Sequence, residues 1–544
     1  MGILFALVFS VFAAGCSRSA LSDGSVTTDG PAIADDGAPV DAGDLTLDRD
    51  AGPPADLIAS GDDSGLTDEP SKSVLRHHRN LSRNGLYADP AFTHASVATL
   101  HRLGNFAAAY DGPTYAQPLF LDGNGQSTDL LFVVTEPNGV YAFDANGGAL
   151  VWTKHLGAAV ARANLPCGNI DPLGITGTPV IDAAARTIYL AAMTTPDGGA
   201  TKRQLVYALS TDDGALRPGW PVDISATAKF GPLGFDSAVQ HQRGALALVG
   251  GVLYVPYGGH YGDCGAYHGW VVGIPVANPA GVIAWATRGM GGGVWAPGGV
   301  ASDGKALFVA TGNTMRVQTF SDGEAIIRLA PGPTFDKQPA DYFAPSNWLA
   351  LDVADIDLGG SGPVLFDLPG ATPAHLIVAL GKSGWAYLID RDDLGGIGSQ
   401  VASALVSSSE IINAAATYST SRGRYVVFHG AGVGCPKGQT GDLMALRIGA
   451  TAPPTIAVAW CAAGNGEGSP AVTTSDGSAE AIVWFIGAEG DGKLHGFDGD
   501  TGDILFAGGA KSDALGPVRR FQTPIVAKGR IYVAGDRALS AFSP

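Results

Sequence analysis

The stretch VYAFDANGGALVW, from Val140 to Trp152, holds two apolar runs separated by an Asn-Gly-Gly turn, and a tryptophan ends the second run. This pattern predicts a β-hairpin, because Asn-Gly accepts the backbone angles of a tight turn between two strands. The pattern recurs as VYALSTDDGALRPGW from Val206, VVGIPVANPAGVIAW from Val271 and LHGFDGDTGDILF from Leu494. A hairpin written this often predicts a repeated architecture.

Each hairpin belongs to a longer unit of alternating strands and glycine turns. Eight such units begin near Tyr115, Thr176, Gly244, Trp295, Gly362, Ile411, Gly468 and Thr523. Units of roughly 40 to 50 residues with four antiparallel strands are typical of β-propeller blades. We therefore expect an all-β, eight-bladed propeller over residues 75–544, with seven blades as the alternative because insertions blur the boundaries around residues 290–420.

The last unit supplies only three strands, TPIVAKG, RIYVAGD and ALSAFSP, before the sequence stops at Pro544. The segment ATLHRLGNFAA, from Ala98 to Ala108, precedes the first full unit and can provide the fourth strand. Pairing the N- and C-terminal strands in one blade would close the ring without an exposed sheet edge. We accordingly expect Phe542 to lie close to Leu103.

The N-terminus reads MGILFALVFSVFAAGCSRS, an apolar run that ends in small residues before Cys16. The run is too short to span a bilayer and has the form of an export signal. It resembles a bacterial lipoprotein signal over residues 1–16, which implies that Cys16 carries a lipid anchor. Ser17 after the cysteine implies the outer membrane. We therefore expect a lipid-anchored protein of the cell envelope.

Residues 17–72 are rich in Asp, Gly, Ala, Ser and Pro and predict a disordered tether, because they offer nothing to bury. Of the formal net charge of -18, Ser17 to Pro70 contribute -11, which leaves -7 for the rest of the chain. The acidity therefore belongs mainly to the tether and indicates no substrate preference. No basic stripe is present, which argues against nucleic acid as a partner.

Five cysteines in an exported protein favour disulfides. Cys435 and Cys461 flank a predicted hairpin, so its adjacent strands can bring them together. With Cys16 reserved for lipid, Cys167 and Cys264 form the remaining pair. The sequence contains no C-x-x-C motif, which argues against a structural zinc site and a c-type haem.

The YAFD…G…LVW repeats resemble those of the quinoprotein alcohol dehydrogenase-like superfamily, whose members are eight-bladed propellers that in some cases carry pyrroloquinoline quinone. Segments such as CGNIDPLGITGTPVID, VATGN and LALDVADIDLGGSGPVLF are similar to bacterial proteins with PQQ-binding-like repeats and no established reaction. The resemblance implies quinone and calcium as candidate cofactors. The sequence lacks the two adjacent cysteines that often cover the quinone in the dehydrogenases.

The resemblance implies a set of candidate site residues. Asn313 is similar to a metal-binding Asn, Asp352 and Asp355 lie where a catalytic Asp is expected, and Asp355 is a second candidate metal ligand. Trp295 is a candidate stacking wall for a quinone. The third metal ligand that the resemblance implies, a Glu, cannot be assigned. Turn-capping roles for Asp and Asn are the simpler interpretation.

The densest polar segment runs from His241 to Trp270. Arg243 can bind a carboxylate with two hydrogen bonds, while His260 and His268 are candidate cofactor or metal contacts. The alternative is a network that satisfies loop carbonyls between blades.

We expect a monomeric binding or scaffolding module for a protein, glycan or small ligand. A quinone- and calcium-dependent dehydrogenase of alcohols or sugars is the alternative.

Overall fold

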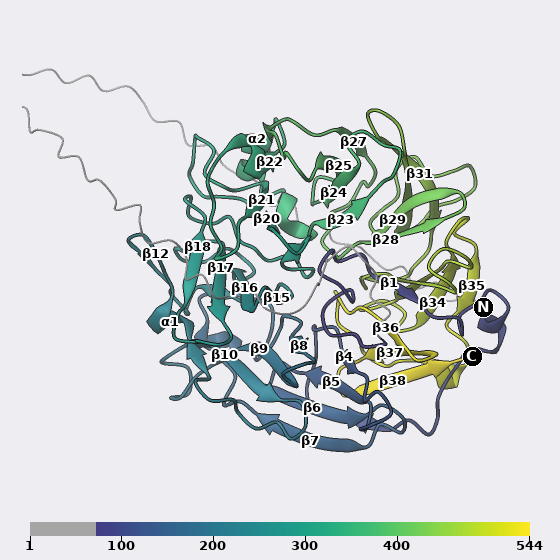
Figure 1. Ribbon diagram of the computed structural model, residues 1–544, viewed down its shortest axis with the longest axis horizontal. Helices are drawn as coiled ribbons and strands as arrows, with labels where there is room; N and C mark the ends of the chain where they lie inside the picture. The colour runs from purple at the N-terminus through teal and green to yellow at the C-terminus, as the bar shows by residue number, and fades with distance from the viewer. Residues whose placement is uncertain (1–71) are drawn as a thin grey trace, which may run out of the picture. The chain divides into compact units, whose positions relative to one another are not determined.

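The computed structural model describes residues 72–544, so Cys16, the signal segment and nearly all of the predicted tether lie outside the described part. The described chain is all-β and forms eight four-stranded antiparallel blades around a ring (Figure 1). Eight blades exclude the alternative of seven. Only two short α-helices, α1 (Ile224–Thr227) and α2 (Trp348–Ala354), interrupt the strands. Within residues 72–544, no helix has the length and apolarity that a membrane crossing requires.

Each blade is a meander in which consecutive strands pair, and the inner strand comes first. Blades 1 and 2 are β4 (Leu119–Leu121), β5 (Leu130–Val134), β6 (Gly139–Asp144), β7 (Leu150–His155) and β8 (Val180–Asp182), β9 (Thr187–Thr194), β10 (Arg203–Ser210), β11 (Val222–Asp223). Blades 3 and 4 are β15 (Ala247–Val249), β16 (Val252–Gly259), β17 (Trp270–Pro275), β18 (Ile283–Ala286) and β19 (Ala301–Ser302), β20 (Leu307–Thr311), β21 (Ala325–Leu329), β22 (Tyr342–Ala344).

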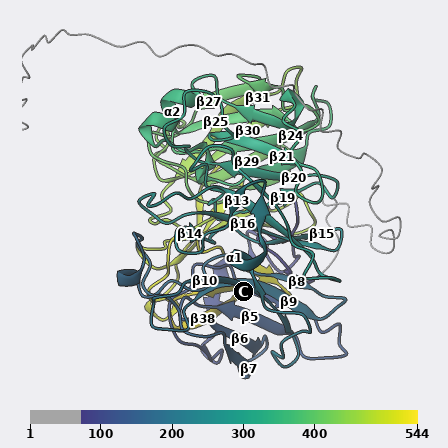
Figure 2. The same ribbon diagram turned by 90° about the vertical axis from the view of Figure 1, so that its left-hand side faces the viewer.

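The second half of the ring repeats the arrangement. Blades 5 and 6 are β23 (Val364–Asp367), β24 (His375–Leu380), β25 (Trp385–Asp390), β27 (Ala402–Leu405) and β28 (Ala416–Thr420), β29 (Gly423–His429), β30 (Leu443–Gly449), β31 (Thr455–Ala462). Blade 7 is β32 (Ala471–Thr474), β33 (Ile482–Ile486), β34 (Leu494–Asp498) and β35 (Ile504–Ala507). In the side view, β24, β25 and β30 lie at one edge of the ring and β5, β6 and β7 lie at the opposite edge (Figure 2).

Strands from both ends of the described chain complete blade 8. Its first three strands are β36 (Ile525–Ala527), β37 (Arg530–Ala534) and β38 (Ala538–Ser543), and β38 pairs with β2 (His101–Arg102) and β3 (Ala108–Ala109). Arg102 lies opposite Phe542, and the Leu103 N–H donates to the Ala541 carbonyl at 2.8 Å. The expected closure of the ring is therefore confirmed.

Additional short strands extend the blades at their margins. They are β1 (Leu86–Ala88) beside β32, the pair β12 (Lys229–Phe230) and β13 (Leu233–Gly234), β14 (Gln240–His241) beside β16, and β26 (Gly396–Ile397) beside β22.

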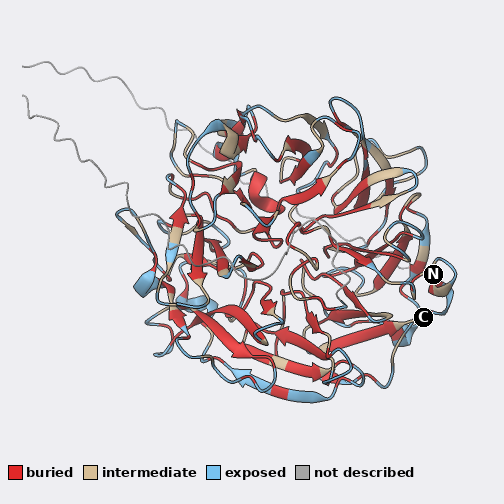
Figure 3. Ribbon diagram, in the orientation of Figure 1, coloured by how far each residue is buried: buried red, intermediate tan, exposed pale blue. Residues whose placement is uncertain are grey.

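Burial depends on the position of a strand within its blade (Figure 3). All three residues of the inner strand β4 are buried, whereas only Trp152 is buried in the outer strand β7. In the hairpin from Val140 to Trp152, the alternation of buried and exposed side chains therefore places Trp152 against the neighbouring blade. The Trp152 Nε1–H donates to the Thr211 carbonyl of blade 2 at 2.8 Å.

The tryptophan that ends a hairpin thus docks on the turn of the next blade. Trp460 of blade 6 repeats the contact, because its Nε1–H donates to the Gly499 carbonyl of blade 7 at 2.8 Å. Glycine is needed in these turns. A Cβ atom at Gly214 would lie 2.8 Å from the Trp152 ring, and one at Gly502 would lie 2.7 Å from the Trp460 ring.

The segment from Ser73 to Asp89 lines the inner edges of the blades, which its sequence does not predict. Its backbone carbonyls and N–H groups bond to the inner strands of blades 1, 2, 4, 5, 6 and 7 through Phe120, Ile181, Ser302, Leu365, Thr417 and Val472. Arg83 donates to the Leu246 carbonyl of blade 3, and the Asp89 carboxylate accepts from the Gly529 N–H of blade 8. We call Ser73–Asp89 the axial segment; it contacts every blade.

Two disulfides are present, Cys167–Cys264 and Cys435–Cys461, with Cα–Cα distances of 6.0 and 5.6 Å. These are the expected pairs. Cys461 lies on β31 of blade 6, and the loop between β29 and β30 carries Cys435.

Replacing both Cys435 and Cys461 by serine is expected to lower the free energy of unfolding by about 3 kcal/mol, because the bridge closes a loop of 26 residues in the unfolded chain. Denaturant unfolding of the oxidised protein and of the double variant measures the difference. Equal midpoints and slopes would contradict the prediction.

Candidate functional site

One cavity of about 680 Å³ opens on one face of the ring, and we call it the funnel. Four cationic and five acidic side chains line it together with aromatic and backbone groups. They are Arg243, Lys382, Arg519, Arg520, Asp263, Asp355, Asp357, Glu410 and Glu489. Polar groups that converge on one concave site are typical of ligand-binding pockets.

The blades contribute to the funnel from equivalent places. The residue four positions before the inner strand lines it in blades 1, 2, 3, 6 and 8, as Tyr115, Thr176, Arg243, Ile412 and Phe521. Each inner strand therefore starts at the funnel and runs away from it. A much smaller cavity of about 10 Å³ lies below Arg243 and is lined by His77 of the axial segment, so the axial segment lies beneath the funnel floor.

The side of the funnel formed by blades 3 to 5 is acidic. Lys382 Nζ lies 2.7 Å from Asp357 and 3.2 Å from Asp355, and Asp357 is buried. Burial lowers the pKa of Lys382, but the charges and hydrogen bonds of Asp357 and Asp355 outweigh it and raise the pKa above its ordinary value. The ammonium group therefore stays charged and balances part of this carboxylate cluster.

Asp263 is the third carboxylate of the acidic side, and it accepts a hydrogen bond from the Tyr267 hydroxyl at 2.7 Å. Burial raises the pKa of Asp263, the Tyr267 hydrogen bond lowers it, and the nearby charges of Asp357 and Asp355 raise it further. The net result is a pKa above that of an ordinary Asp, so Asp263 accepts a proton more readily.

The side formed by blades 7 and 8 is basic, but its cations are paired. Arg519 binds Asp536 through two hydrogen bonds of 2.7 and 2.8 Å, and Arg520 lies 2.6 Å from Glu489. Burial raises the pKa of Glu489, but its hydrogen bonds with Arg520 lower it to below the usual value. These pairs form a fixed charged wall.

Trp295 provides an aromatic wall between the cationic groups. The guanidinium of Arg243 lies 5.5 Å and Lys382 Nζ lies 5.7 Å from its ring centroid, which are distances of cation–π contacts. The indole is held by close backbone, because a Cβ atom at Gly312 would lie 3.1 Å from its Nε1 atom. An aromatic surface beside two cations suits a planar anion.

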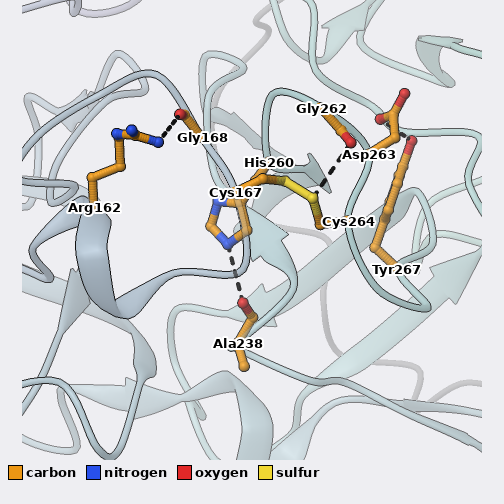
Figure 4. Close-up of a disulfide and its surroundings, with 9 residues drawn as sticks. All are labelled: Arg162, Cys167, Gly168, Ala238, His260, Gly262, Asp263, Cys264 and Tyr267. Carbon is orange, nitrogen blue, oxygen red and sulfur yellow. Dashed lines mark hydrogen bonds between the residues drawn. A yellow bond between two sulfur atoms is a disulfide. The ribbon is translucent and has the colours of Figure 1, made fainter.

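The Cys167–Cys264 bridge joins the connection between blades 1 and 2 to a loop of blade 3 at the rim of the funnel (Figure 4). His260 lies beside the bridge, and its Nε2 atom is 3.1 Å from the Ala238 carbonyl. Burial lowers the pKa of His260 to about 4, while the Ala238 contact raises it and the Arg243 charge lowers it. His260 is therefore neutral at ordinary pH and helps hold the loop.

The structure brings four of the residues singled out from the sequence into the funnel wall: Trp295, Arg243, His260 and Asp355. Three others lie outside that wall. Asp352 accepts from the Thr314 N–H and hydroxyl at 2.5 and 2.7 Å, the Asn313 N–H donates to Asp357, and His268 Nδ1 lies 2.9 Å from the Thr287 carbonyl. Through these contacts the three residues cap turns and hold loops in place.

Five charged residues of the funnel were not proposed from the sequence: Lys382, Arg519, Arg520, Glu410 and Glu489. They line the same cavity as Trp295 and Arg243 only because the ring brings distant blades together. The recurring position before each inner strand is the signal that points to Arg519 and Arg520, which lie just ahead of Phe521.

The carboxylates of the acidic side do not fit a calcium ion as they are arranged. Within residues 72–544, no three His, Cys, Asp or Glu side chains are grouped so that they could hold a metal ion. Lys382 takes the place of a cation between Asp355 and Asp357, and Glu324 accepts the Leu358 N–H at 2.6 Å. In this arrangement a lysine, and not a metal, balances the carboxylates.

Comparison with solved structures finds proteins that are similar to this chain in fold. The chain is similar to a quinohemoprotein alcohol dehydrogenase of Pseudomonas putida HK5 with a TM-score of 0.58 and 16% identity, over 87% of this chain and 80% of that one. The chain therefore has a propeller fold like that of this dehydrogenase.

Two further dehydrogenases share this quinoprotein-like propeller. The quinohemoprotein alcohol dehydrogenase of Comamonas testosteroni gives a TM-score of 0.58 and 15% identity, over 87% of this chain and 80% of that one. A europium-containing methanol dehydrogenase gives 0.57 and 13%, over 86% and 91%. No family model and no curated protein matches the sequence. Identities this low establish the fold of the quinoprotein-like propeller and leave its chemistry to its own residues.

Proposed function

We propose that this chain is a lipid-anchored binding module of the cell envelope that captures a small ligand in the funnel of its propeller. The single observation that carries the proposal is the funnel itself, a charged cavity of about 680 Å³ with an aromatic wall, built by residues from most of the blades. Its volume lies in the range of small-molecule sites, which is roughly 300–1,000 Å³.

The arrangement of the funnel supports binding in preference to a merely structural role. A structural charge network satisfies its own members, as Arg519 with Asp536 and Arg520 with Glu489 do. In contrast, the side chain of Asp355 is 59% exposed and Arg243 has no carboxylate within ion-pair distance among residues 72–544. Groups with spare capacity in a concave site are available to a ligand.

The proposed location follows from the sequence alone. The segment before Cys16 has the form of a lipoprotein signal, and two disulfides suit an oxidising compartment. A protein or glycan partner of the propeller faces is compatible with the same anchoring. We expect the protein to act as a monomer, since both ends of the described chain close its own ring.

Ligand-induced stabilisation of the full-length protein tests the proposed function. A ligand at a hundredfold excess over its dissociation constant is expected to stabilise the fold by about 2.7 kcal/mol, and this appears as a higher melting temperature. The ligands to be screened are neutral oligosaccharides, amino acids, carboxylates and pyrroloquinoline quinone.

The variant Asn169→Trp, which places bulk at the rim of the funnel, is expected to abolish the stabilisation. Lys154→Trp on the exposed strand β7 is the matched control and is expected to respond like the wild type. A ligand that stabilises Asn169→Trp and wild type equally would place binding elsewhere, for instance on a propeller face.

The second candidate is a quinone-dependent dehydrogenase, and the observation that favours it is Trp295 with two cations beside its ring. Arg243 and Lys382 would hold the carboxylates of the quinone, which when bound would supply the oxidant for an alcohol or a sugar. Asp355 would then be positioned to take the hydroxyl proton. Calcium would have to displace Lys382 from Asp355 and Asp357.

Reconstitution with pyrroloquinoline quinone and calcium separates the two candidates. Dye reduction with alcohols or sugars that is lost in Asp355→Asn, but kept in the exposed-site control Asp213→Asn, would establish the dehydrogenase. Stabilisation by a ligand without any dye reduction would leave the binding module.

A further inference from the structure

Arg243 is unusual among the cations of the funnel because no carboxylate of residues 72–544 pairs with it. Lys382, Arg519 and Arg520 each have an acidic partner within 3.2 Å. The guanidinium of Arg243 lies over Trp295, its Nη2 atom is 3.4 Å from His241 Nδ1, and its buried Nε atom has no hydrogen-bond partner in the described chain. Arg243 is half-buried, and a partly desolvated cation without a counter-charge makes this site complementary to an anion.

A line of polar side chains leads from Arg243 into the protein. An arginine only donates hydrogen bonds, so His241 Nδ1 must accept from it and the imidazole proton must sit on Nε2. His241 Nε2 lies 3.0 Å from the Thr176 hydroxyl oxygen, which therefore accepts. Burial, together with the Arg243 charge, holds the pKa of His241 well below its usual value, which agrees with a neutral ring. The Thr176 hydroxyl keeps its own proton to donate further.

Glu136 of blade 1 lies close to the inner end of this line, because its carboxylate accepts from the N–H of Gly174, two residues before Thr176. Its side chain is fully buried, Oε2 accepts from the Gly174 N–H at 2.8 Å, and Oε1 accepts no hydrogen bond from the described residues. Burial raises the pKa of Glu136 to about 7, although the Gly174 N–H, the Thr176 hydroxyl and the positive charge of Arg243 favour the carboxylate.

The other groups that face Glu136 leave its charge dependent on Arg243. Burial, together with the Glu136 charge, raises the pKa of Tyr115 to about 12, so Tyr115 stays neutral. His241 is neutral as well. Among residues 72–544, Arg243 is the cation whose charge favours the charged form of Glu136, so Glu136 and a bound anion would compete for the same positive charge.

We propose that the funnel floor is a proton-coupled anion site, in which Arg243 binds a carboxylate or a tetrahedral oxyanion of the ligand and Glu136 takes up a proton as the anion binds. The inference rests on the proposed function of the funnel and names the chemical class of its ligand. At a pH below the midpoint of the Glu136 titration, Glu136 is neutral and Arg243 attracts the anion. Above it the Glu136 carboxylate cancels that attraction, so affinity falls as the pH rises.

Titration calorimetry of the full-length protein with oxalate and with sulfate tests this inference and separates the two anion geometries. Both probes keep their charge between about pH 6 and about pH 8. The dissociation constant of the probe that binds is expected to rise about fivefold over this interval, because a one-unit coupling between the two sites reaches its tenfold limit only over a wider pH range. Titrations in buffers of different ionisation enthalpy are expected to show proton uptake on binding near pH 7.

Two variants make the assignment specific. Glu136→Gln, a neutral copy of the protonated side chain, is expected to bind at about pH 8 as the wild type does at about pH 6, without proton uptake. Arg243→Met is expected to lose binding, while Arg422→Met, at an arginine whose side chain is 61% exposed, is unchanged. Near-ultraviolet circular dichroism and melting temperature confirm that each variant is folded.

Three outcomes would each overturn the inference: neither probe binds at either pH, Arg243→Met binds like the wild type, or Glu136→Gln keeps the pH dependence. Failure of the inference does not remove the proposed function. A neutral oligosaccharide whose binding is blocked by Asn169→Trp would leave the funnel as a ligand site and exclude the anion chemistry. If no ligand in the screen stabilised the wild-type protein, both the inference and the proposed function would be wrong.

Discussion

Replacement of Arg83 by leucine is expected to lower the free energy of unfolding by about 4 kcal/mol, because three buried carbonyl groups lose their donor at once. The Arg83 guanidinium donates to the carbonyls of Val300, Leu246 and His77 at distances of 2.7 to 3.0 Å. Burial, with a smaller contribution from the Arg76 charge, lowers the pKa of Arg83 to about 9, so it still donates as a cation at neutral pH.

The reason for the large effect is the position of Arg83 in the axial segment. Its hydrogen bonds join that segment to blade 3 and add to the backbone bond between Leu81 and Ser302 of blade 4, and a leucine cannot replace them. Urea unfolding of Arg83→Leu is compared with Arg422→Leu, at an exposed arginine that is expected to change stability by less than about 0.5 kcal/mol. A loss below about 1 kcal/mol for Arg83→Leu would show that water satisfies these carbonyls.

Replacement of Phe542 by alanine is expected to cost about 4 kcal/mol, the middle of the range for a buried phenylalanine. Phe542 is fully buried, lies opposite Arg102 of β2 and Ile531 of β37, and belongs to a core cluster that includes residues of blades 1, 7 and 8. A cavity at this position weakens the one blade whose strands come from both ends of the described chain.

Ile504→Ala is the matched control, because Ile504 lies on the outer strand β35 with 55% of its side chain exposed. It is expected to change the free energy of unfolding by less than about 0.5 kcal/mol. If Phe542→Ala and Ile504→Ala were equally stable, the closing blade would not limit the stability of the ring. Tryptophan fluorescence and far-ultraviolet circular dichroism should give coincident transitions if the ring unfolds as one unit.

The repeated hairpins made the architecture predictable, because each one encodes its strands and its turn locally. The eight blades, the closure beside Phe542 and the pairing of Cys435 with Cys461 all follow from features that lie within about one blade of each other, or at the two ends of a ring that must close. Local signals of this kind are the strongest that a single sequence offers.

The axial segment could not be predicted, because it has no strand periodicity and its partners are spread over the whole chain. Val74 bonds to Phe120, while the Gly85 carbonyl accepts from Val472, and nothing near Val74 or Gly85 in the sequence points to those partners. The same limit applies to the funnel. Trp295 and Arg243 were recognised individually, but the pairing of Lys382 with Asp357 depends on how blade 5 folds against its neighbours.

Asp352 and Asp355 have different environments, although the resemblance implies the same catalytic role for both. Asp352 and Asp355 follow one another closely in the sequence, yet α2 ends between them and Asp355 adopts a left-handed conformation with φ of 56°. As a result Asp352 turns to Thr314 while Asp355 reaches the funnel. Two candidate catalytic residues that are three positions apart can therefore occupy different environments, which their spacing alone does not reveal.

The axial segment enters the propeller on one particular face of the ring. The Ser73 hydroxyl accepts from the Asp122 N–H, just after β4, whereas Tyr115 at the other end of that strand lines the funnel. Ser73 therefore lies on the side of the ring opposite the funnel. The described chain therefore enters the ring on one face and opens its funnel on the other, so the entry point of the chain leaves the mouth of the funnel free.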